Sequence, residues 1–206
     1  LLIFYNYYLF MKTLGIIGNG FVGEAMAFSF SPAINTKVFD LDDSKSLNSL
    51  DDTLTSDFVF VCLPSPMKSN GKQDLSFINN FFKDEKISSK PIYILKSTVL
   101  PGTTKGLSKK YPKLKIVFSP EFLTERTAKL DILTQSRMII GSDDNDLSSD
   151  VEKLFRLRFK NKNIIKTDTV TAEFIKYMNN NFFATKVSLM NEFYRLGKKI
   201  GVDWEE

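Results

Sequence analysis

The chain has 206 residues, of which 43% are hydrophobic and 25% charged, and its net charge is +4. An ordinary globular protein of this length can bury a sizeable core, and so mild a charge does not by itself indicate nucleic acid or a membrane. The absence of histidine excludes a histidine-based metal site and a histidine general base, so we expect no bound metal. The single cysteine, Cys62, excludes an internal disulfide and favours a reducing, cytoplasmic location.

The first ten residues are apolar and aromatic, and they precede Met11. They are too few to span a bilayer, and they lack the basic start of a signal peptide. We interpret residues 1–10 as an extension upstream of a translation start at Met11, outside the fold. A tail that touches a membrane is the alternative.

A glycine-rich turn follows the first predicted strand, Thr13–Ile17, and precedes a predicted helix at 21–30. In the spacing G-x-G-x-x-G, the first glycine permits the tight turn and the second lets a pyrophosphate approach the backbone. The third lets helix and strand pack closely, and the helix N-terminus offers unpaired N–H groups to phosphates. The turn predicts a dinucleotide site, and a purely structural turn is the alternative. Its residues are Gly18, Asn19, Gly20, Phe21, Val22 and Gly23.

A second predicted strand, 36–39, ends in Asp40, 22 positions after Gly18. A carboxylate at this place can bind a ribose diol. A 2′-phosphate about 4 Å from it would meet a repulsion of about 4 kcal/mol at an effective dielectric constant near 20. Lys45 could reduce that repulsion, but no arginine directly follows Asp40. The sequence therefore favours NAD over NADP.

Further strands and helices alternate along the chain. Apolar runs of strand length lie at 57–63, 91–95, 115–118, 137–141 and 163–166. Helices are predicted at 74–82, at 145–159 and after Pro101, with Thr103 or Thr104 as N-cap, whereas 42–55 contains at most a short helix. The alternation predicts an α/β fold with a doubly wound parallel sheet.

The strand at 57–63 contains Cys62 and ends in Pro64-Ser65-Pro66, which cannot continue it. Ligands of open α/β sheets bind at the carboxyl ends of the strands. We therefore expect Pro64 and Ser65 to border the cofactor, and a rigid loop without contact is the alternative.

One long helix is predicted from Thr169 to the end, about 45 Å at 1.5 Å per residue. A helix of this length usually carries another domain or a partner subunit. Lys176 and Asn180 stand four residues apart and so share a face, where they could hold an oxyanion or a hydroxyl, although such a pair often faces solvent. The helix carries an apolar stripe of Ile175, Met178, Phe182, Leu189, Phe193, Leu196 and Ile200.

A basic run lies at 153–166, and it could attract a nucleotide or nucleic acid. Apolar residues interleave it, and it lacks the aromatic and glycine pattern of a known nucleic-acid module. We interpret the run as a solvated helix face and loop, and we expect no nucleic-acid partner.

Together these segments resemble the UDP-glucose/GDP-mannose dehydrogenase family. The resemblance covers Lys12 to Glu206, and its motifs occur in the family's order. They are Gly18–Gly23, Pro64–Pro66, Lys96–Thr104 (KSTVLPGTT), Ser119–Glu125 (SPEFLTE), Ala172–Asn180 (AEFIKYMNN) and Ala184–Ser188 (ATKVS).

The resemblance implies a Rossmann-type NAD-binding domain at 11–167, and from 168 to 206 a long central helix that begins a middle, dimerisation domain. It implies oxidation of a nucleotide-sugar C6 alcohol to a carboxylate by NAD. From the apolar stripe we also expect a homodimer that pairs through the long helix in the full-length protein. The implied NAD contacts are the glycine turn, Asp40, Lys45, Ser65, Thr98 and Glu125. The implied sugar contacts are Glu121, Phe122, Leu123, Lys176 and Asn180. Of these, Glu121 and Thr98 would work through water as acid–base groups, while Lys176 and Asn180 would stabilise the oxyanion on C6.

The sequence departs from the family pattern in two respects. The family's nucleophile is a cysteine in a glycine-rich segment of the middle domain, which we expect beyond Glu206 together with a nucleotide-binding C-terminal domain. Cys62, inside a predicted strand, cannot replace that nucleophile. In addition, only about twenty residues separate Asp40 from the strand at 61–63, fewer than in common members, and this leaves the sugar open.

Two other functions stay open from the residues. A β-hydroxyacid-type NAD dehydrogenase also carries a Lys-x-x-x-Asn helix after its dinucleotide domain, but the Ser97–Gly102 loop and Pro120–Leu123 favour a nucleotide-sugar dehydrogenase. A non-catalytic NAD-binding or dimerising module fits the lack of the family's cysteine. Glu121, Lys176 and Asn180 together favour catalysis in the parent protein.

Overall fold

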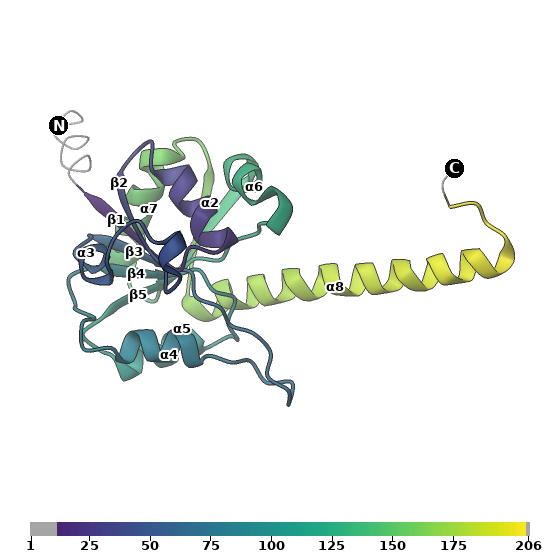
Figure 1. Cartoon of the computed structure of the whole chain (residues 1–206), viewed down its shortest axis with the longest axis horizontal. Helices are drawn as coiled ribbons and strands as arrows, with labels where there is room; N and C mark the ends of the chain where they lie inside the picture. Colours follow the sequence, from purple (N-terminus) through teal and green to yellow (C-terminus); the bar gives the residue numbers. More distant parts are fainter. Residues whose placement is uncertain (1–11, 205–206) are drawn as a thin grey trace.

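The computed structural model describes residues 12–204, so the predicted extension at 1–10 lies outside the described residues. Within them, seven strands form one sheet with helices on both faces, and a long helix leaves it (Figure 1). The strands are β1 (Thr13–Ile17), β2 (Asn35–Phe39), β3 (Phe58–Val61), β4 (Ile92–Leu95), β5 (Lys115–Phe118), β6 (Arg137–Gly141) and β7 (Asn163–Thr167). The helices are α2 (Phe21–Phe30), α3 (Leu50–Leu54), α4 (Ser76–Lys83), α5 (Thr103–Lys110), α6 (Ala128–Thr134), α7 (Asn145–Arg158) and α8 (Thr169–Ile200), with 3-10 turns at Asp43–Lys45 and Glu125–Thr127.

The sheet has the strand order β2-β1-β3-β4-β5-β6-β7. Neighbouring strands are parallel except β5 and β6, which meet antiparallel at Phe118 and Gly141. The predicted doubly wound α/β fold is confirmed, and the prediction of a wholly parallel sheet is wrong at this one pair. A parallel crossover must return the chain to the opposite edge of the sheet. The short helix α6 packs on α2 instead, and β6 runs back toward the sheet and ends beside Phe118, at the carboxyl end of β5.

This reversal decides where α8 begins. Thr167, the last residue of β7, pairs with Gly141, which in turn pairs with Phe118 at the carboxyl end of β5. The chain therefore enters α8 at the edge of the sheet where parallel α/β proteins bind their ligands.

Two apolar cores lie on the two faces of the sheet. Helices α2, α6 and α7 cover one face, where Phe30, Phe60 and Phe155 pack with ring centroids 5.3–6.2 Å apart. Helices α3, α4 and α5 and the base of α8 cover the other face around Tyr93 and Leu95. The strands β3 and β4 are buried throughout, as the continuous apolar runs predict for strands covered on both sides.

The predicted elements agree with the structure to within a few residues at their ends, with three corrections. The helix α6 was not predicted. The N-cap of α5 is Gly102, with φ of +94°, and not Thr103 or Thr104, because the chain turns sharply after Pro101. Cys62 lies one residue beyond β3 and not inside the strand, since the chain leaves the ladder before Pro64.

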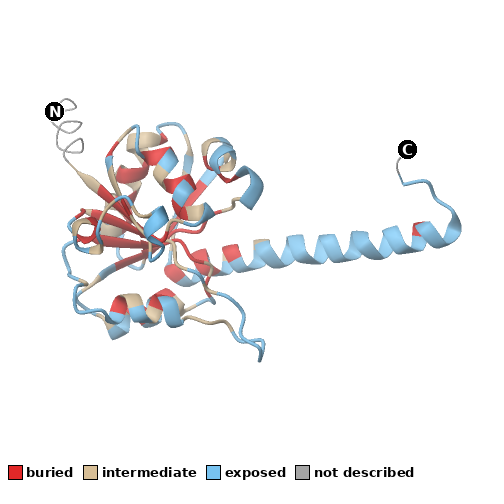
Figure 2. Cartoon of the chain, viewed as in Figure 1, coloured by how far each residue is buried: buried red, intermediate tan, exposed pale blue. Residues whose placement is uncertain are grey.

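Helix α8 has 32 residues, about 48 Å at 1.5 Å per residue. Its base is buried against the sheet, whereas its outer part extends away from the domain with exposed side chains (Figure 2). The predicted apolar stripe is therefore exposed from Met178 to Ile200. Over the described residues, no helix combines the length and apolar character that crossing a bilayer requires.

Candidate functional site

The glycine turn joins β1 to α2, and two of its glycines are required by packing. Gly18 has a φ of +89°, and a Cβ there would lie 2.5 Å from the carbonyl oxygen of Cys62. A Cβ on Gly23 would lie 1.9 Å from the carbonyl oxygen of Gly18. A Cβ on Gly20, by contrast, would have nothing within 4 Å. The turn thus leaves open space above Gly20 at the N-terminus of α2, a cradle that fits a phosphate group.

Asp40 ties the end of β2 to this turn. Its Oδ2 accepts a hydrogen bond from the backbone N–H of Asn19 at 2.5 Å, and its Oδ1 accepts one from the N–H of Asp42 at 2.9 Å. The Asn19 side chain in turn donates to the carbonyl oxygen of Lys45 at 2.8 Å. The carboxylate therefore lies beside the phosphate cradle.

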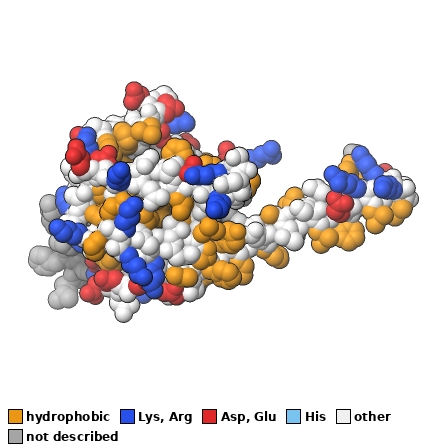
Figure 3. Space-filling view, turned by 90° about the horizontal axis from the view of Figure 1, so that it is seen from below, with side chains coloured by type: hydrophobic (Ala, Val, Ile, Leu, Met, Phe, Trp, Pro, Cys, Tyr) orange, Lys and Arg blue, Asp and Glu red, His pale blue; other side chains and the backbone are white. Residues whose placement is uncertain are grey.

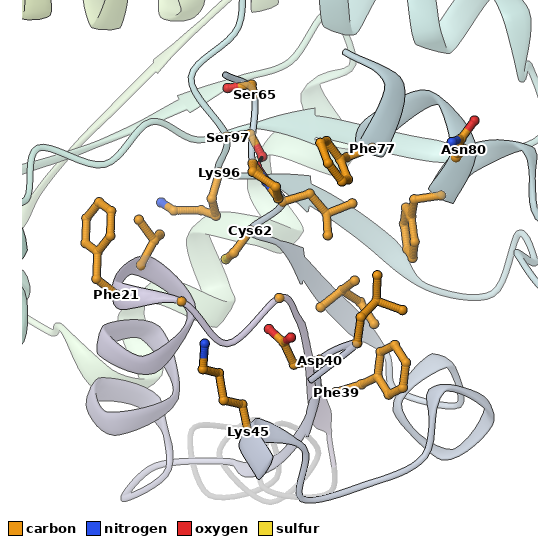
Figure 4. A pocket seen from close by; sticks show the side chains of 18 of the residues that line it. Phe21, Phe39, Asp40, Lys45, Cys62, Ser65, Phe77, Asn80, Lys96 and Ser97 are labelled. Atoms are coloured by element: carbon orange, nitrogen blue, oxygen red, sulfur yellow. Dashed lines mark hydrogen bonds between the residues drawn. The ribbon is translucent and has the colours of Figure 1, made fainter. Parts of the chain in front are cut away.

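A cavity of about 840 Å³ extends over the carboxyl ends of β1 to β5, within the range of about 300–1,000 Å³ for small-molecule sites. Figure 4 shows its wall, with Asp40 and Lys45 on one side and Lys96 and Ser97 on the other. The predicted cofactor residues that line it are Gly18, Gly20, Phe21, Val22, Asp40, Lys45, Pro64, Ser65 and Thr98. Asn19, Gly23 and Glu125 do not line it, and Glu125 lies exposed in a 3-10 turn.

The apolar wall of this cavity was missed at the sequence level. Phe77 and Phe81 of α4 line it together with Leu41 and Leu50. These two aromatic residues stand four apart, so they share a helix face beside the buried one formed by Ile78 and Phe82. A second apolar face on so short a helix was the sequence pattern that could have indicated this wall of the cavity. Such a wall suits a planar, apolar ring.

Glu121 and Lys176 form a buried ion pair at the edge of the cavity. Lys176 Nζ lies 2.9 Å from Glu121 Oε1, and the two side chains are only 5% and 8% exposed. Glu121 Oε2 accepts the N–H of Leu123 at 2.6 Å, and Lys176 Nζ lies 5.5 Å from the ring centre of Phe122. The structure thus brings together four of the five predicted sugar-site residues. The fifth, Asn180, lies one turn further out on α8 and is exposed.

Lys96, at the end of β4, is a buried lysine that sequence reasoning did not single out. It is 2% exposed and lines the cavity, and its Nζ donates to Ser119 Oγ at 3.3 Å and to the carbonyl oxygen of Pro120 at 3.2 Å. Burial lowers the pKa of Lys96 to about 8. Burial also raises the pKa of the Cys62 thiol to about 12, so Cys62, although it lines the cavity, is no thiolate nucleophile at neutral pH.

Glu173 joins α8 to the turn that follows β4. Its fully buried carboxylate accepts the N–H of Gly102 at 2.6 Å and the N–H of Thr104 at 2.7 Å. No side chain of the turn itself caps the start of α5. Glu173, which belongs to another helix, provides this cap. Burial raises the pKa of Glu173. This carboxylate fixes the base of α8, and with it Lys176, against the cavity edge.

The doubly wound sheet, the phosphate cradle at the first β–α turn and the carboxylate at the end of β2 define a Rossmann-type dinucleotide-binding domain. Residues 45–158 match the NAD binding domain of the UDP-glucose/GDP-mannose dehydrogenase family. Residues 170–206 match the central domain of the same family. The chain belongs to this family, as the sequence motifs predicted.

Individual relatives agree. UDP-glucose 6-dehydrogenase TuaD of Bacillus subtilis is 29% identical over 94% of this chain and 50% of its own length. UDP-glucose 6-dehydrogenase of Rickettsia bellii is 34% identical over 70% of this chain and 35% of its own length. The crystal structure of a ternary complex of GDP-mannose dehydrogenase from Pseudomonas aeruginosa superimposes with a TM-score of 0.80 at 25% identity, over 94% of this chain and 54% of that one. The chain thus spans about half the length, or less, of the relatives it matches.

Proposed function

We propose that this chain is the cofactor-binding part of an NAD-dependent nucleotide-sugar dehydrogenase, which oxidises a sugar C6 alcohol to a uronate. The observation that carries the proposal is the position of Glu121, which lines the cavity and also pairs with Lys176 of α8. One carboxylate therefore borders both the cofactor cavity and the helix that carries the other polar groups. Alcohol oxidation needs this proximity, because a hydride and a proton leave the same carbon–oxygen group.

We infer that NAD lies along the cavity with its pyrophosphate over the glycine turn and its adenosine ribose at Asp40. The apolar wall that includes Phe77 and Phe81 then suits the adenine ring. When bound, NAD supplies the ring that accepts the hydride. The proposed contacts further include Asn19, Val22, Lys45, Pro64, Ser65, Thr98 and Glu125.

For the substrate, we assign the sugar site to the edge of the cavity next to α8. Glu121 and Thr98 hold and move a proton through water, and Lys176 and Asn180 stabilise negative charge on the C6 oxygen. Phe122 and Leu123 provide backbone and apolar contacts beside them. The buried Lys176 already carries a fixed positive charge at this place, so little reorganisation is needed as negative charge develops.

Asp40→Ala is expected to weaken NAD binding by about 1–3 kcal/mol, the range for hydrogen bonds to a charged group. NADP binding should weaken less or improve, because the substitution removes a negative charge that repels the 2′-phosphate. Calorimetric titration of the wild type and of Asp40→Ala with both cofactors measures the two changes. Unchanged NAD affinity would contradict the assigned site. An equal loss for NAD and NADP would mean that Asp40 only shapes the loop through Asn19.

We also propose that residues 11–167 form the cofactor domain, and that 168–206 begin a second domain that pairs with another copy of the chain. Figure 3 shows hydrophobic side chains along α8 and at its base. The outer part of the helix exposes Phe182, Phe183, Val187, Leu189, Met190, Phe193, Leu196 and Ile200. A contiguous apolar surface of this kind is rare on a monomer.

In sedimentation experiments at micromolar concentration, the chain is expected to be a dimer. The double substitution Phe182→Asp and Phe193→Asp should produce a monomer, because it places charges in the apolar contact. Lys109→Glu changes an exposed charge near the C-terminal end of α5, and it serves as the control that should leave the dimer intact. A monomeric wild-type chain would contradict the proposed pairing.

A further inference from the structure

The segment between β3 and α4 forms a small hairpin, residues 66–74, that projects from the sheet (Figure 1). Met67 and Gln73 pair in an antiparallel bridge, and the N–H of Asp74 donates to the carbonyl oxygen of Pro66 at 2.7 Å. Lys68 and Asp74 add an ion pair at 3.4 Å. The hairpin thus has internal structure of its own, and it holds Gln73 at a fixed place near the cavity.

The Gln73 side chain bonds to the neighbouring turn after β4 through both ends of its amide. Its Nε2 donates to the carbonyl oxygen of Thr98 at 2.7 Å, and its Oε1 accepts the N–H of Leu100 at 3.2 Å. A single side chain therefore satisfies an acceptor and a donor two residues apart, as an adjacent strand would. The carbonyl oxygen of Thr98 accepts a second bond, from Ser65 Oγ at 2.6 Å.

These bonds fix the backbone of Thr98 but leave its hydroxyl available. Thr98 lines the cavity, and within residues 12–204 its hydroxyl has no hydrogen-bond partner. A polar group that is held in place but unbonded can bind a ligand without first breaking a contact or losing conformational freedom. Both hydrogen bonds of the Gln73 side chain go to backbone atoms, those of Thr98 and Leu100, so this side chain can orient Thr98.

We propose that Gln73 is a positioning residue, which holds the Thr98 turn in the geometry that receives the nicotinamide half of the cofactor. This inference rests on the proposed function, because it takes NAD as the ligand of the cavity. It assigns to the hairpin at 66–74 a role as a brace of the binding site.

Gln73→Leu is expected to lower NAD affinity about 5- to 20-fold, the effect of losing one or two neutral hydrogen bonds. The chain's other glutamine, Gln135, lies between α6 and β6, and Gln135→Leu is the matched control that should leave NAD affinity unchanged. In the protein without cofactor, Gln73→Leu should also speed hydrogen exchange at the Leu100 amide, which loses its acceptor.

Gln73→Glu keeps the size of the side chain at position 73 and changes only its hydrogen bonding, so it tests the hydrogen bonds apart from the packing. Above neutral pH its carboxylate can accept from Leu100 but cannot donate to the Thr98 carbonyl oxygen, so NAD affinity should fall. As the pH decreases from 7 to 4, through the ordinary glutamate pKa of about 4.3, the carboxyl group takes up a proton and can donate again, so the affinity should recover toward that of the wild type. The charged groups of the hairpin, Lys68 and Asp74, are present in both proteins, so the wild-type titration corrects for them.

The outcomes distinguish this inference from the proposed function. Weaker binding by Gln73→Leu, with recovery of Gln73→Glu at low pH, supports it. NAD binding by the wild type with unchanged affinity in both Gln73 variants overturns the positioning role alone. Failure of the wild-type chain to bind NAD overturns the proposed function and this inference with it.

Discussion

Gly23→Ala is expected to lower the free energy of unfolding by about 3 kcal/mol or more, at the upper end of overpacking substitutions. The added Cβ would lie 1.9 Å from the carbonyl oxygen of Gly18, and 3.3 Å from a methyl carbon of Ile16. The backbone at Gly18 cannot move away easily, because its N–H donates a hydrogen bond to the carbonyl oxygen of Phe39 at 2.9 Å. Urea unfolding followed by circular dichroism measures the loss.

Gly20→Ala is the matched control within the same turn. Its Cβ would meet nothing within 4 Å, and its φ of −74° suits any residue. Stability should change by about 1 kcal/mol or less, the cost of alanine at a helix N-cap. NAD affinity, however, should fall at least about tenfold, because the methyl group would occupy the space through which a pyrophosphate approaches the backbone. Equal stability of the two variants, or undiminished NAD binding by Gly20→Ala, would contradict this account of the turn.

Lys176→Met is expected to cost about 3–5 kcal/mol of stability, because it leaves the Glu121 carboxylate buried without its partner. The N–H of Leu123 still bonds that carboxylate, but a neutral donor does not replace a cation. Adding Glu121→Gln to Lys176→Met should recover much of the loss, since the buried charge is then gone. A double-mutant cycle on the four unfolding curves gives the coupling between the two side chains.

The pair Lys129 and Glu24 provides a comparison at similar distance and different burial. Its Nζ–Oε1 distance is 2.7 Å, but the two side chains are 49% and 57% exposed. Lys129→Met should therefore change stability by less than about 1 kcal/mol. If Lys176→Met proves as mild as Lys129→Met, the Glu121–Lys176 pair does not stabilise the fold, and its burial serves only the site.

Much of the fold could be predicted from local pattern. The apolar runs at β3 and β4 have the length and the continuity of strands covered on both faces, and the glycine turn marks the β1–α2 junction. The antiparallel pair β5–β6 could not be predicted, because strand direction depends on where the intervening chain packs. The segment 119–136 has no strong hydrophobic periodicity, so its sequence did not indicate that α6 would form and pack against α2.

The site residues that stand in family motifs could be predicted from the sequence, whereas those that matter because they are buried could not. Thr98, Glu121 and Lys176 stand in family motifs, and the last two meet in the structure. Lys96 and Glu173 stand in the same motifs, but both are buried, and their burial depends on the tertiary fold, in which α8 packs against β5, β6 and α5. Gln73 lies in a hairpin whose contact with Thr98 is a product of the tertiary fold alone.

The buried Lys96 has a consequence for how proton movements in this protein could be followed. Histidine, the usual side chain that titrates near neutrality, is absent, and the thiol of Cys62 has a pKa of about 12. Lys96, with a pKa of about 8, is a side chain that would change its charge near that pH range. Because it borders the cavity, a cationic ring bound there would disfavour its protonated form, and a neutral ring would not. If NAD binds as proposed, proton release from Lys96 into a weakly buffered solution would therefore differ between oxidised and reduced cofactor.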